Sequence, residues 1–198
     1  EESGASGNSD VEWIIDPLDG TTNFLHGLPH FAVSIGVREK GKLCHGVVYD
    51  PYRQETFSAS KGDGALMNNR RMRAAGARSL NEALIGTGEP FSPGPRMDRY
   101  LPQLEAVIRE CGGLRRGGSA ALDLAYVASG RLDGFWELAL KPWDLAAGIV
   151  LCREAGAAVY GLGEGDPMKT GDILCAHPRL LEPLRRLLEG SGTKTEQS

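Results

Sequence analysis

The feature that most constrains this chain is the run from Trp13 to Phe24, which reads WIIDPLDGTTNF. Residues 13–15 have the continuous apolar character of a strand that is buried on both faces. Pro17 cannot donate a hydrogen bond to a sheet, so we expect the strand to end at Asp16. Asp16 is therefore predicted to lie at the carboxyl end of a buried strand.

The two carboxylates of this run, Asp16 and Asp19, indicate a metal site. They are three residues apart on a bent loop, where they can share or bridge divalent cations. Mg²⁺ takes oxygen ligands, including a backbone carbonyl such as that of Leu18. Gly20 and Thr21 open a short predicted helix, whose free N–H groups favour a phosphate. An ordinary Asp-Gly turn would explain the fragment alone, but the whole run predicts a metal and phosphate site.

A second run, from Glu137 to Gly156, reads ELALKPWDLAAGIVLCREAG. Pro142 is typical of the first position of a helix, which places Asp144 in the first turn. Capping of that helix is a sufficient role for Asp144 when the second run is taken alone. Together with the first run, a third carboxylate for the metals is the better interpretation.

The two runs together resemble the lithium-sensitive, metal-dependent phosphatase superfamily, and the chain is most similar to inositol monophosphatases of the bacterial extragenic-suppressor type. The resemblance covers nearly all 198 residues. It implies an α+β fold, a layered α/β/α/β/α sugar-phosphatase-type sandwich that here lacks its N-terminal helices. It also implies one phosphatase domain over residues 1–189, incomplete at its N-terminus, and a disordered tail over residues 190–198. As given, the chain is expected to be a poor enzyme of low thermal stability.

The resemblance also assigns site residues. It implies two or three Mg²⁺ ions and an attacking water that Thr21 and Glu1 orient. The implied metal ligands are Glu1, Asp16, Asp19, Asp144 and the Leu18 carbonyl, and the implied substrate-binding residues are Gly20, Thr21, Gly118, Ser119, Ala120 and Glu137. From the pattern alone, Glu1 is a frayed terminus and Ser119 caps a helix that begins at Ala120.

The expected activity is Mg²⁺-dependent hydrolysis of inositol 1-phosphate by a metal-activated water. Within the superfamily the alternatives are fructose bisphosphatase, adenosine bisphosphate nucleotidase and histidinol phosphatase. A different alternative is a partner-binding protein that associates with RNA polymerase, because bacterial relatives of this type are linked to transcription complexes. The resemblance further implies a homodimer and inhibition by lithium.

Composition excludes several other classes. The formal net charge of -4 argues against an obligate nucleic-acid surface. The four cysteines are widely spaced, which indicates neither a zinc site nor a disulfide framework. No apolar run approaches the length of a membrane span, so we expect a cytoplasmic protein.

The remaining elements follow from periodicity and turn residues. The sequence predicts an antiparallel meander over residues 31–60 and further strands over residues 83–88, 132–138, 157–160 and 172–176. Helices are predicted over residues 98–111, 120–129 and 178–188, in addition to the one that begins at Pro142. In the first of these, Leu101, Leu104, Val107 and Ile108 are expected to form the buried side.

Overall fold

The computed structural model describes residues 9–89, 94–163 and 165–191. Its elements in chain order are β1 (Val11–Asp19), α1 (Thr21–Leu25), β2 (Ala32–Glu39), β3 (Lys42–Asp50), β4 (Glu55–Ser60), β5 (Gly64–Met67), β6 (Arg70–Met72), the 3-10 turn η1 (Leu80–Glu82), β7 (Leu84–Thr87), α2 (Pro95–Glu110), β8 (Gly113–Arg115), α3 (Ala120–Ala128), β9 (Gly134–Glu137), α4 (Pro142–Glu154), β10 (Ala158–Gly161), α5 (Pro167–Thr170), β11 (Ile173–Ala176) and α6 (Pro178–Gly190).

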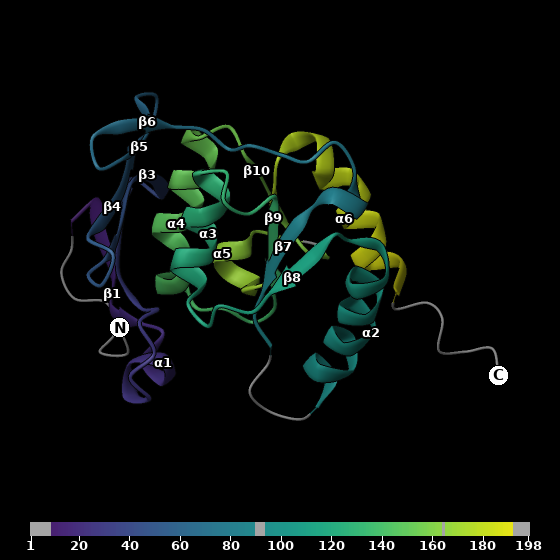
Figure 1. Ribbon diagram of the computed structural model, residues 1–198. Helices are drawn as coiled ribbons and strands as arrows, with labels where there is room; N and C mark the ends of the chain where they lie inside the picture. Colours follow the sequence, from purple (N-terminus) through teal and green to yellow (C-terminus); the bar gives the residue numbers. More distant parts are fainter. Residues whose placement is uncertain (1–8, 90–93, 164, 192–198) are drawn as a thin grey trace.

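The strands form two sheets. The first is an antiparallel meander in the order β1-β2-β3-β4-β5-β6, and the second has the order β10-β11-β9-β7-β8. In the second sheet β7 pairs in parallel with β8 and β9, while β11 pairs antiparallel with β9 and β10. Figure 1 shows the layers: the six-stranded sheet, then α3 and α4, then the five-stranded sheet, then α2 and α6. This confirms the predicted α+β layered fold, and the described residues hold four of its five expected layers.

The meander is confirmed, but the sequence did not predict its last two strands. The sequence instead predicts surface turns over residues 61–64 and 68–71, where glycine, asparagine and arginine are frequent. In the structure β5 pairs with β4, and β6 pairs with β5. Short edge strands of this kind are held by main-chain hydrogen bonds to a neighbour, so they need no alternating side-chain pattern.

Helix α4 lies closely against the first sheet because two strand residues are glycine. A Cβ atom on Gly36 would lie 2.5 Å from Ala146 Cβ, and one on Gly46 would lie 2.6 Å from the Ala147 carbonyl oxygen. The Ser34 hydroxyl also donates to the Trp143 carbonyl, at 3.2 Å. These contacts fix the first turn of α4, which carries Asp144, beside the carboxyl end of β1.

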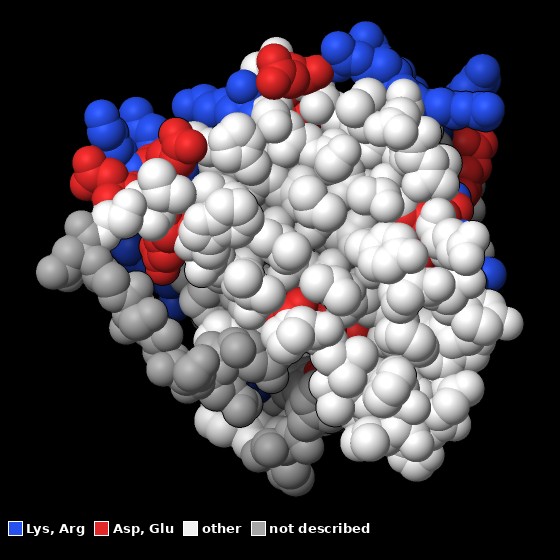
Figure 2. All heavy atoms as spheres, turned by 90° about the vertical axis from the view of Figure 1, so that its left-hand side faces the viewer, with Lys and Arg blue, Asp and Glu red and all other residues white. Residues whose placement is uncertain are grey.

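The outward side of β1 does not match the prediction of a strand buried on both faces. Ile14 is buried, whereas Trp13 is 65% exposed and Ile15 is 43% exposed. Only the side that faces α4 is covered by described residues, and the opposite side is apolar without a layer over it. Figure 2 shows that this face of the molecule is largely uncharged, with Lys and Arg gathered along its upper edge.

Helix α2 begins at Pro95, earlier than expected, and buries only part of the predicted side. Val107 is buried and Leu104 packs against the core, as predicted. The buried residues of the helix are Tyr100, Gln103 and Val107. Leu101 and Ile108, which were predicted to be buried, are 53% and 61% exposed. The helix packs along α6 and against the end of the second sheet, so the position of these two neighbours decides which side chains are covered.

None of the helices in the described ranges combines the length and the apolar character that crossing a membrane requires.

Candidate metal and phosphate site

Three carboxylates predicted from separate runs meet in the structure. Each of Asp16, Asp19 and Asp144 offers one oxygen atom, and these atoms lie within 4.8 Å of one another. Asp16 and Asp19 come from the end of β1 and Asp144 from the first turn of α4. The strand does not stop at Asp16 as predicted: it pairs with β2 as far as Asp19, across a register irregularity between the two acids. That irregularity accommodates Pro17 and leaves both acids buried on the α4 side.

The turn after β1 is held by its own side chains. Asp16 Oδ1 accepts a hydrogen bond from the Leu18 backbone N–H at 2.9 Å. The Thr21 hydroxyl donates to the Leu18 carbonyl, also at 2.9 Å. Gly20 has a φ of 87°, a left-handed conformation that suits glycine, and directly precedes α1. The Leu18 carbonyl, Gly20 and Thr21 are therefore brought together next to Asp16.

Asp19 joins β1 to the start of α3. Its Oδ2 atom accepts hydrogen bonds from the Ser119 hydroxyl at 2.5 Å and from the Ala121 backbone N–H at 2.8 Å. Burial raises the pKa of Asp19 to about 7, with smaller contributions from Asp144 and Asp16, although the two hydrogen bonds lower it. A bound cation would relieve the cost of burying this charge.

The two alternative roles considered for Asp144 are compatible in the structure. Its Oδ2 atom accepts a hydrogen bond from the Lys141 backbone N–H at 2.7 Å, so it does cap α4. Its carboxylate also belongs to the cluster of three acids. A carboxylate has two oxygens and about four acceptor positions, so capping leaves room for a further ligand.

The predicted substrate-binding residues lie around the start of α3 and the end of β9. Ser119 caps α3 by accepting from the Leu122 N–H at 3.3 Å, and its hydroxyl proton goes to Asp19. Its side chain is thus engaged within the protein, which leaves backbone groups of residues 118–120 for a substrate.

Glu137 lies at the end of β9, and burial raises its pKa well above the ordinary value. The predicted ligand Glu1 lies outside the described residues.

Two residues near the site were not predicted. Asn23 Nδ2 donates to the His30 carbonyl at 2.7 Å and to the Gly117 carbonyl at 2.9 Å, which ties α1 to the loop before α3. Asp123 is 3% exposed, and burial, reinforced by Asp19, raises its pKa well above the ordinary value. One signal was available in the sequence: Asp123 is the single charged residue within the otherwise uncharged run AALDLAYVA.

The cluster Asp16, Asp19 and Asp144 fits a hard divalent cation. All three side chains offer oxygen, two of them are buried, and each comes from a rigidly packed element. Mg²⁺ binds through one or two carboxylates together with water and phosphate oxygens. The cluster therefore has the donor type and the charge that such an ion requires.

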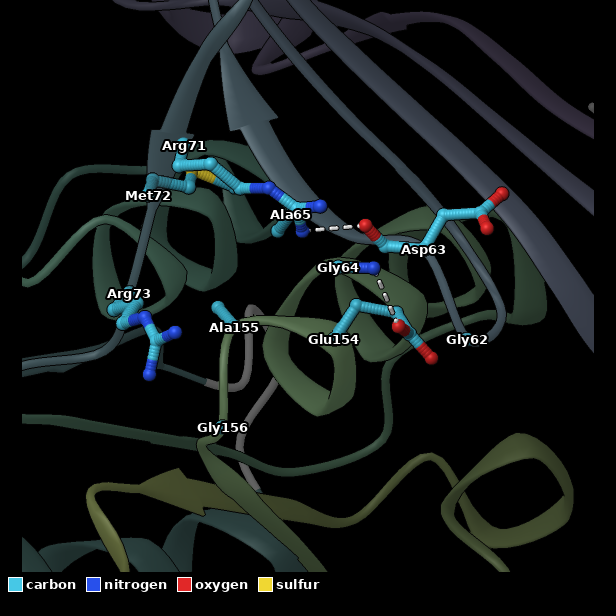
Figure 3. A pocket seen from close by; sticks show the side chains of 10 residues that line it. All are labelled: Gly62, Asp63, Gly64, Ala65, Arg71, Met72, Arg73, Glu154, Ala155 and Gly156. Carbon is cyan, nitrogen blue, oxygen red and sulfur yellow. Dashed lines mark hydrogen bonds between the residues drawn. The ribbon is translucent and has the colours of Figure 1, made fainter.

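A separate hollow of about 520 Å³ lies at the other end of the first sheet, where the β4–β5 turn meets the end of α4. Figure 3 shows that Glu154 faces the Gly64 N–H, which donates to it at 3.0 Å, and that Arg71 faces the Asp63 carbonyl, at 2.5 Å. None of the predicted site residues lines this hollow.

Comparison with known proteins identifies the family of this chain. A family model described as "Inositol monophosphatase family" matches residues 1–192. The chain belongs to this family. A curated relative named inositol-1-monophosphatase, from Rhizobium meliloti, is 47% identical over 178 residues, which are 89% of this chain and 67% of the relative. The Nus factor SuhB of Escherichia coli K12 is 50% identical over 187 residues, or 93% of this chain and 70% of the relative.

Solved structures give the same result for the fold. The extragenic suppressor protein SuhB of Bartonella henselae superposes with a TM-score of 0.87 at 48% identity, and 90% of this chain and 70% of that one are covered. The inositol monophosphatase of Anabaena gives a TM-score of 0.87 at 40% identity, covering 96% of this chain and 77% of that one. Membership of this family supports a phosphatase activity.

Proposed function

We propose that this protein is a Mg²⁺-dependent phosphomonoesterase whose substrate is inositol 1-phosphate. The observation that carries the proposal is the meeting of Asp16, Asp19 and Asp144, because two separate parts of the chain supply one cluster of oxygen ligands. Family membership supports the phosphatase chemistry. A structural neighbour described as bound to inositol monophosphate, with 29% identity and a TM-score of 0.83, supports the substrate.

Asp16, Asp19, Asp144 and the Leu18 carbonyl would hold two or three Mg²⁺ ions, with Glu1 as a further ligand. When bound, Mg²⁺ supplies Lewis-acid polarisation of the phosphate and an activated water, and both speed up the very slow hydrolysis of a phosphate ester. Binding would also keep Asp19 in its charged form at neutral pH.

The chain's own groups then orient the reactants. The Thr21 hydroxyl gives its proton to the Leu18 carbonyl, so the free lone pairs of Thr21 Oγ1 can accept a hydrogen bond from the attacking water. The first N–H groups of α1, including that of Thr21, have no partner within the helix and suit a phosphate oxygen. These two contacts place water and phosphate on the same turn.

The leaving group would lie against the start of α3 and the end of β9. The described residues make no hydrogen bond to the Glu137 carboxyl, so a substrate hydroxyl can donate to it. The backbone of Gly118, Ser119 and Ala120 offers further polar contacts. Such a pocket favours a polyol over an apolar alcohol.

The test is a screen of phosphate release from inositol 1-phosphate, fructose bisphosphate, adenosine bisphosphate and histidinol phosphate, with and without Mg²⁺. We expect Mg²⁺-dependent release, fastest from inositol 1-phosphate, and inhibition by lithium. The Asp144→Asn variant serves as the blank for contaminating phosphatases. Preference for another ester would contradict the substrate, and no Mg²⁺-dependent release at all would contradict the activity.

The names of several relatives favour a second candidate function. Relatives that are 48% to 50% identical are called Nus factor SuhB, so the second candidate function is association with RNA polymerase. Binding should then persist in the Asp144→Asn variant, because the metal ligands would not take part. Loss of binding in that variant, or none in the unmodified protein, would count against this role.

A further inference from the structure

Asp123 is a buried carboxyl group that the protein itself does not satisfy. It lies in the first turn of α3 and is 3% exposed. No hydrogen bond from the described residues reaches its side chain, whereas buried polar groups are paired in the great majority of cases. Burial and the nearby charge of Asp19 both raise its pKa. An unpaired buried carboxyl group is costly, which calls for an explanation.

Glycine at two positions lets the backbone lie close to Asp123. A Cβ atom on Gly117 would lie 3.0 Å from Asp123 Oδ1, and one on Gly86 would lie 3.7 Å from its Cγ. The same feature recurs at Glu137, where a Cβ atom on Gly88 would lie 2.2 Å from Oε1. Side chains at positions 117 and 88 would therefore crowd these carboxyl groups.

Asp123 and Glu137 lie along the same side of one strand segment. Gly86 contacts Asp123 and Gly88 contacts Glu137, and residues two apart in an extended chain face the same way. Both carboxyl groups interact electrostatically with Asp19, and Glu137 also interacts with Asp123. Asp19, Asp123 and Glu137 thus form one group that extends from the metal cluster toward the proposed leaving-group pocket.

We propose that Asp123 is a specificity-determining residue that, beside Glu137, accepts a hydrogen bond from a hydroxyl of the leaving alcohol. This inference rests on the proposed phosphatase function and deepens it. Two neighbouring carboxyl groups select a leaving group with more than one hydroxyl. They also repel one that carries a second phosphate.

A purely structural role is the competing explanation, and its partner would be His30. The Nε2 atom of His30 is buried without a hydrogen bond. It lies 2.7 Å from the position that a Gly117 Cβ would take, on the same side as Asp123 Oδ1. If Asp123 served only to hold His30 through a water, its replacement would weaken the fold and leave substrate preference unchanged.

The experiment is a double-mutant-type cycle in which a change in the protein is combined with removal of a hydroxyl from the substrate. Rates are measured for the unmodified protein, Asp123→Asn and Asp123→Leu, with inositol 1-phosphate and with analogues that each lack one hydroxyl. We expect Asp123→Leu to lower kcat/KM for inositol 1-phosphate about 10- to 100-fold, the effect of one hydrogen bond to a charged group. Asp123→Asn keeps an acceptor oxygen and should lose less.

The deciding result is whether the loss of kcat/KM from the Asp123→Leu substitution adds to the loss from removing a substrate hydroxyl. For one deoxy analogue the Asp123→Leu variant should lose nothing further, because the hydroxyl that Asp123 would bind is already absent. The variant should also discriminate less against bisphosphates. If every analogue loses as much kcat/KM as inositol 1-phosphate does, Asp123 binds no hydroxyl and the proposal is overturned. Lack of any turnover by the unmodified protein would instead contradict the proposed function.

Thermal unfolding supplies a second readout with a matched control. Removal of an unpaired buried carboxyl group should raise Tm, so both Asp123 variants should melt above the unmodified protein. Asp133 is the control, because it accepts from the Ala77 and Leu84 N–H groups at 2.8 and 2.7 Å. Asp133→Asn should lower Tm. A fall in Tm for both Asp123 variants, equal to that of Asp133→Asn, would favour the His30 role and count against the proposal.

Discussion

The carboxylates of the candidate site differ in their hydrogen-bond partners from those in the rest of the fold, which we call the frame. In the frame, Asp50 is fully buried but accepts hydrogen bonds from the Tyr52 and Arg53 N–H groups and from the Arg53 side chain. In the site, Asp123 is buried and Glu137 is partly buried, neither with such a partner in the described residues, and Asp19 lies beside other acids. The frame satisfies its charges internally, whereas the site leaves them for a cation and a substrate.

This difference predicts opposite consequences for the same kind of substitution. A change in the frame should cost stability and leave the chemistry unaffected. A change in the site should cost chemistry and leave stability equal or higher, as is found where function and stability conflict. Five substitutions test the comparison, from the largest expected effect to the smallest.

The largest effect is expected at the metal cluster. Asp16→Asn and Asp144→Asn should each reduce Mg²⁺-dependent phosphate release by several orders of magnitude, because an amide removes charge that the cations need. Melting curves should show no loss of stability for Asp16→Asn. Near-normal turnover of either variant in saturating Mg²⁺ would show that the two runs do not share one metal site.

The next effect is in the frame, at Asp50. Asp50→Ala leaves two backbone N–H groups without an acceptor and removes one of the two acceptors of Arg53, so we expect a loss of about 2 to 3 kcal/mol in the free energy of unfolding. Urea unfolding measures the loss. The folded fraction should keep its turnover per molecule, and a selective loss of kcat without a change in stability would break the comparison.

A smaller effect is expected at Glu137, which is proposed to touch only the departing part of the substrate. Glu137→Gln should chiefly raise KM for inositol 1-phosphate. The loss of binding free energy should be roughly 1.5 to 3 kcal/mol, that of one hydrogen bond to a charged group. Steady-state kinetics across sugar phosphates checks this. An unchanged preference among those esters would remove Glu137 from the pocket.

The smallest effect is expected on α6, where Glu182 is exposed. Hydrogen bonds from Arg185 and Arg186 lower the pKa of Glu182 from 4.5 to about 2. A lowered pKa means that the ionised form stabilises the folded state above about pH 4.5, and this contribution is lost as the pH falls toward 2. Glu182→Gln should therefore melt slightly below the unmodified protein at pH 7, and the difference should vanish near pH 2. A difference independent of pH would refute this origin.

Much of the site could be predicted from the sequence because its residues lie in two compact runs. Asp16 and Asp19 follow an apolar strand, and Asp144 follows a proline at a helix start, so local pattern places each of them. Local pattern does not show that the two runs meet. That expectation came from the family resemblance. The physical cause is the close approach of α4 to Gly36 and Gly46.

Features that depend on neighbouring layers could not be predicted in this way. The exposure of Trp13 and Ile15 depends on what covers the outer face of the first sheet. The burial of Asp123 depends on the junction of α3 with β7 and the loop before α3. The sequence pattern assigns no role to Asn23, because its role in joining two loops follows only from where the loop at Gly117 lies.

The most direct test of the central claim is titration of Mg²⁺ into the unmodified protein and into Asp16→Asn and Asp144→Asn, followed by calorimetry. Replacement of a residue that only supports a metal ligand already costs about 10- to 100-fold in affinity, so loss of a ligand should cost at least as much. We predict binding by the unmodified protein and affinity at least about tenfold weaker in both variants. Equal affinity in all three proteins would contradict the claim that these carboxylates form one metal site.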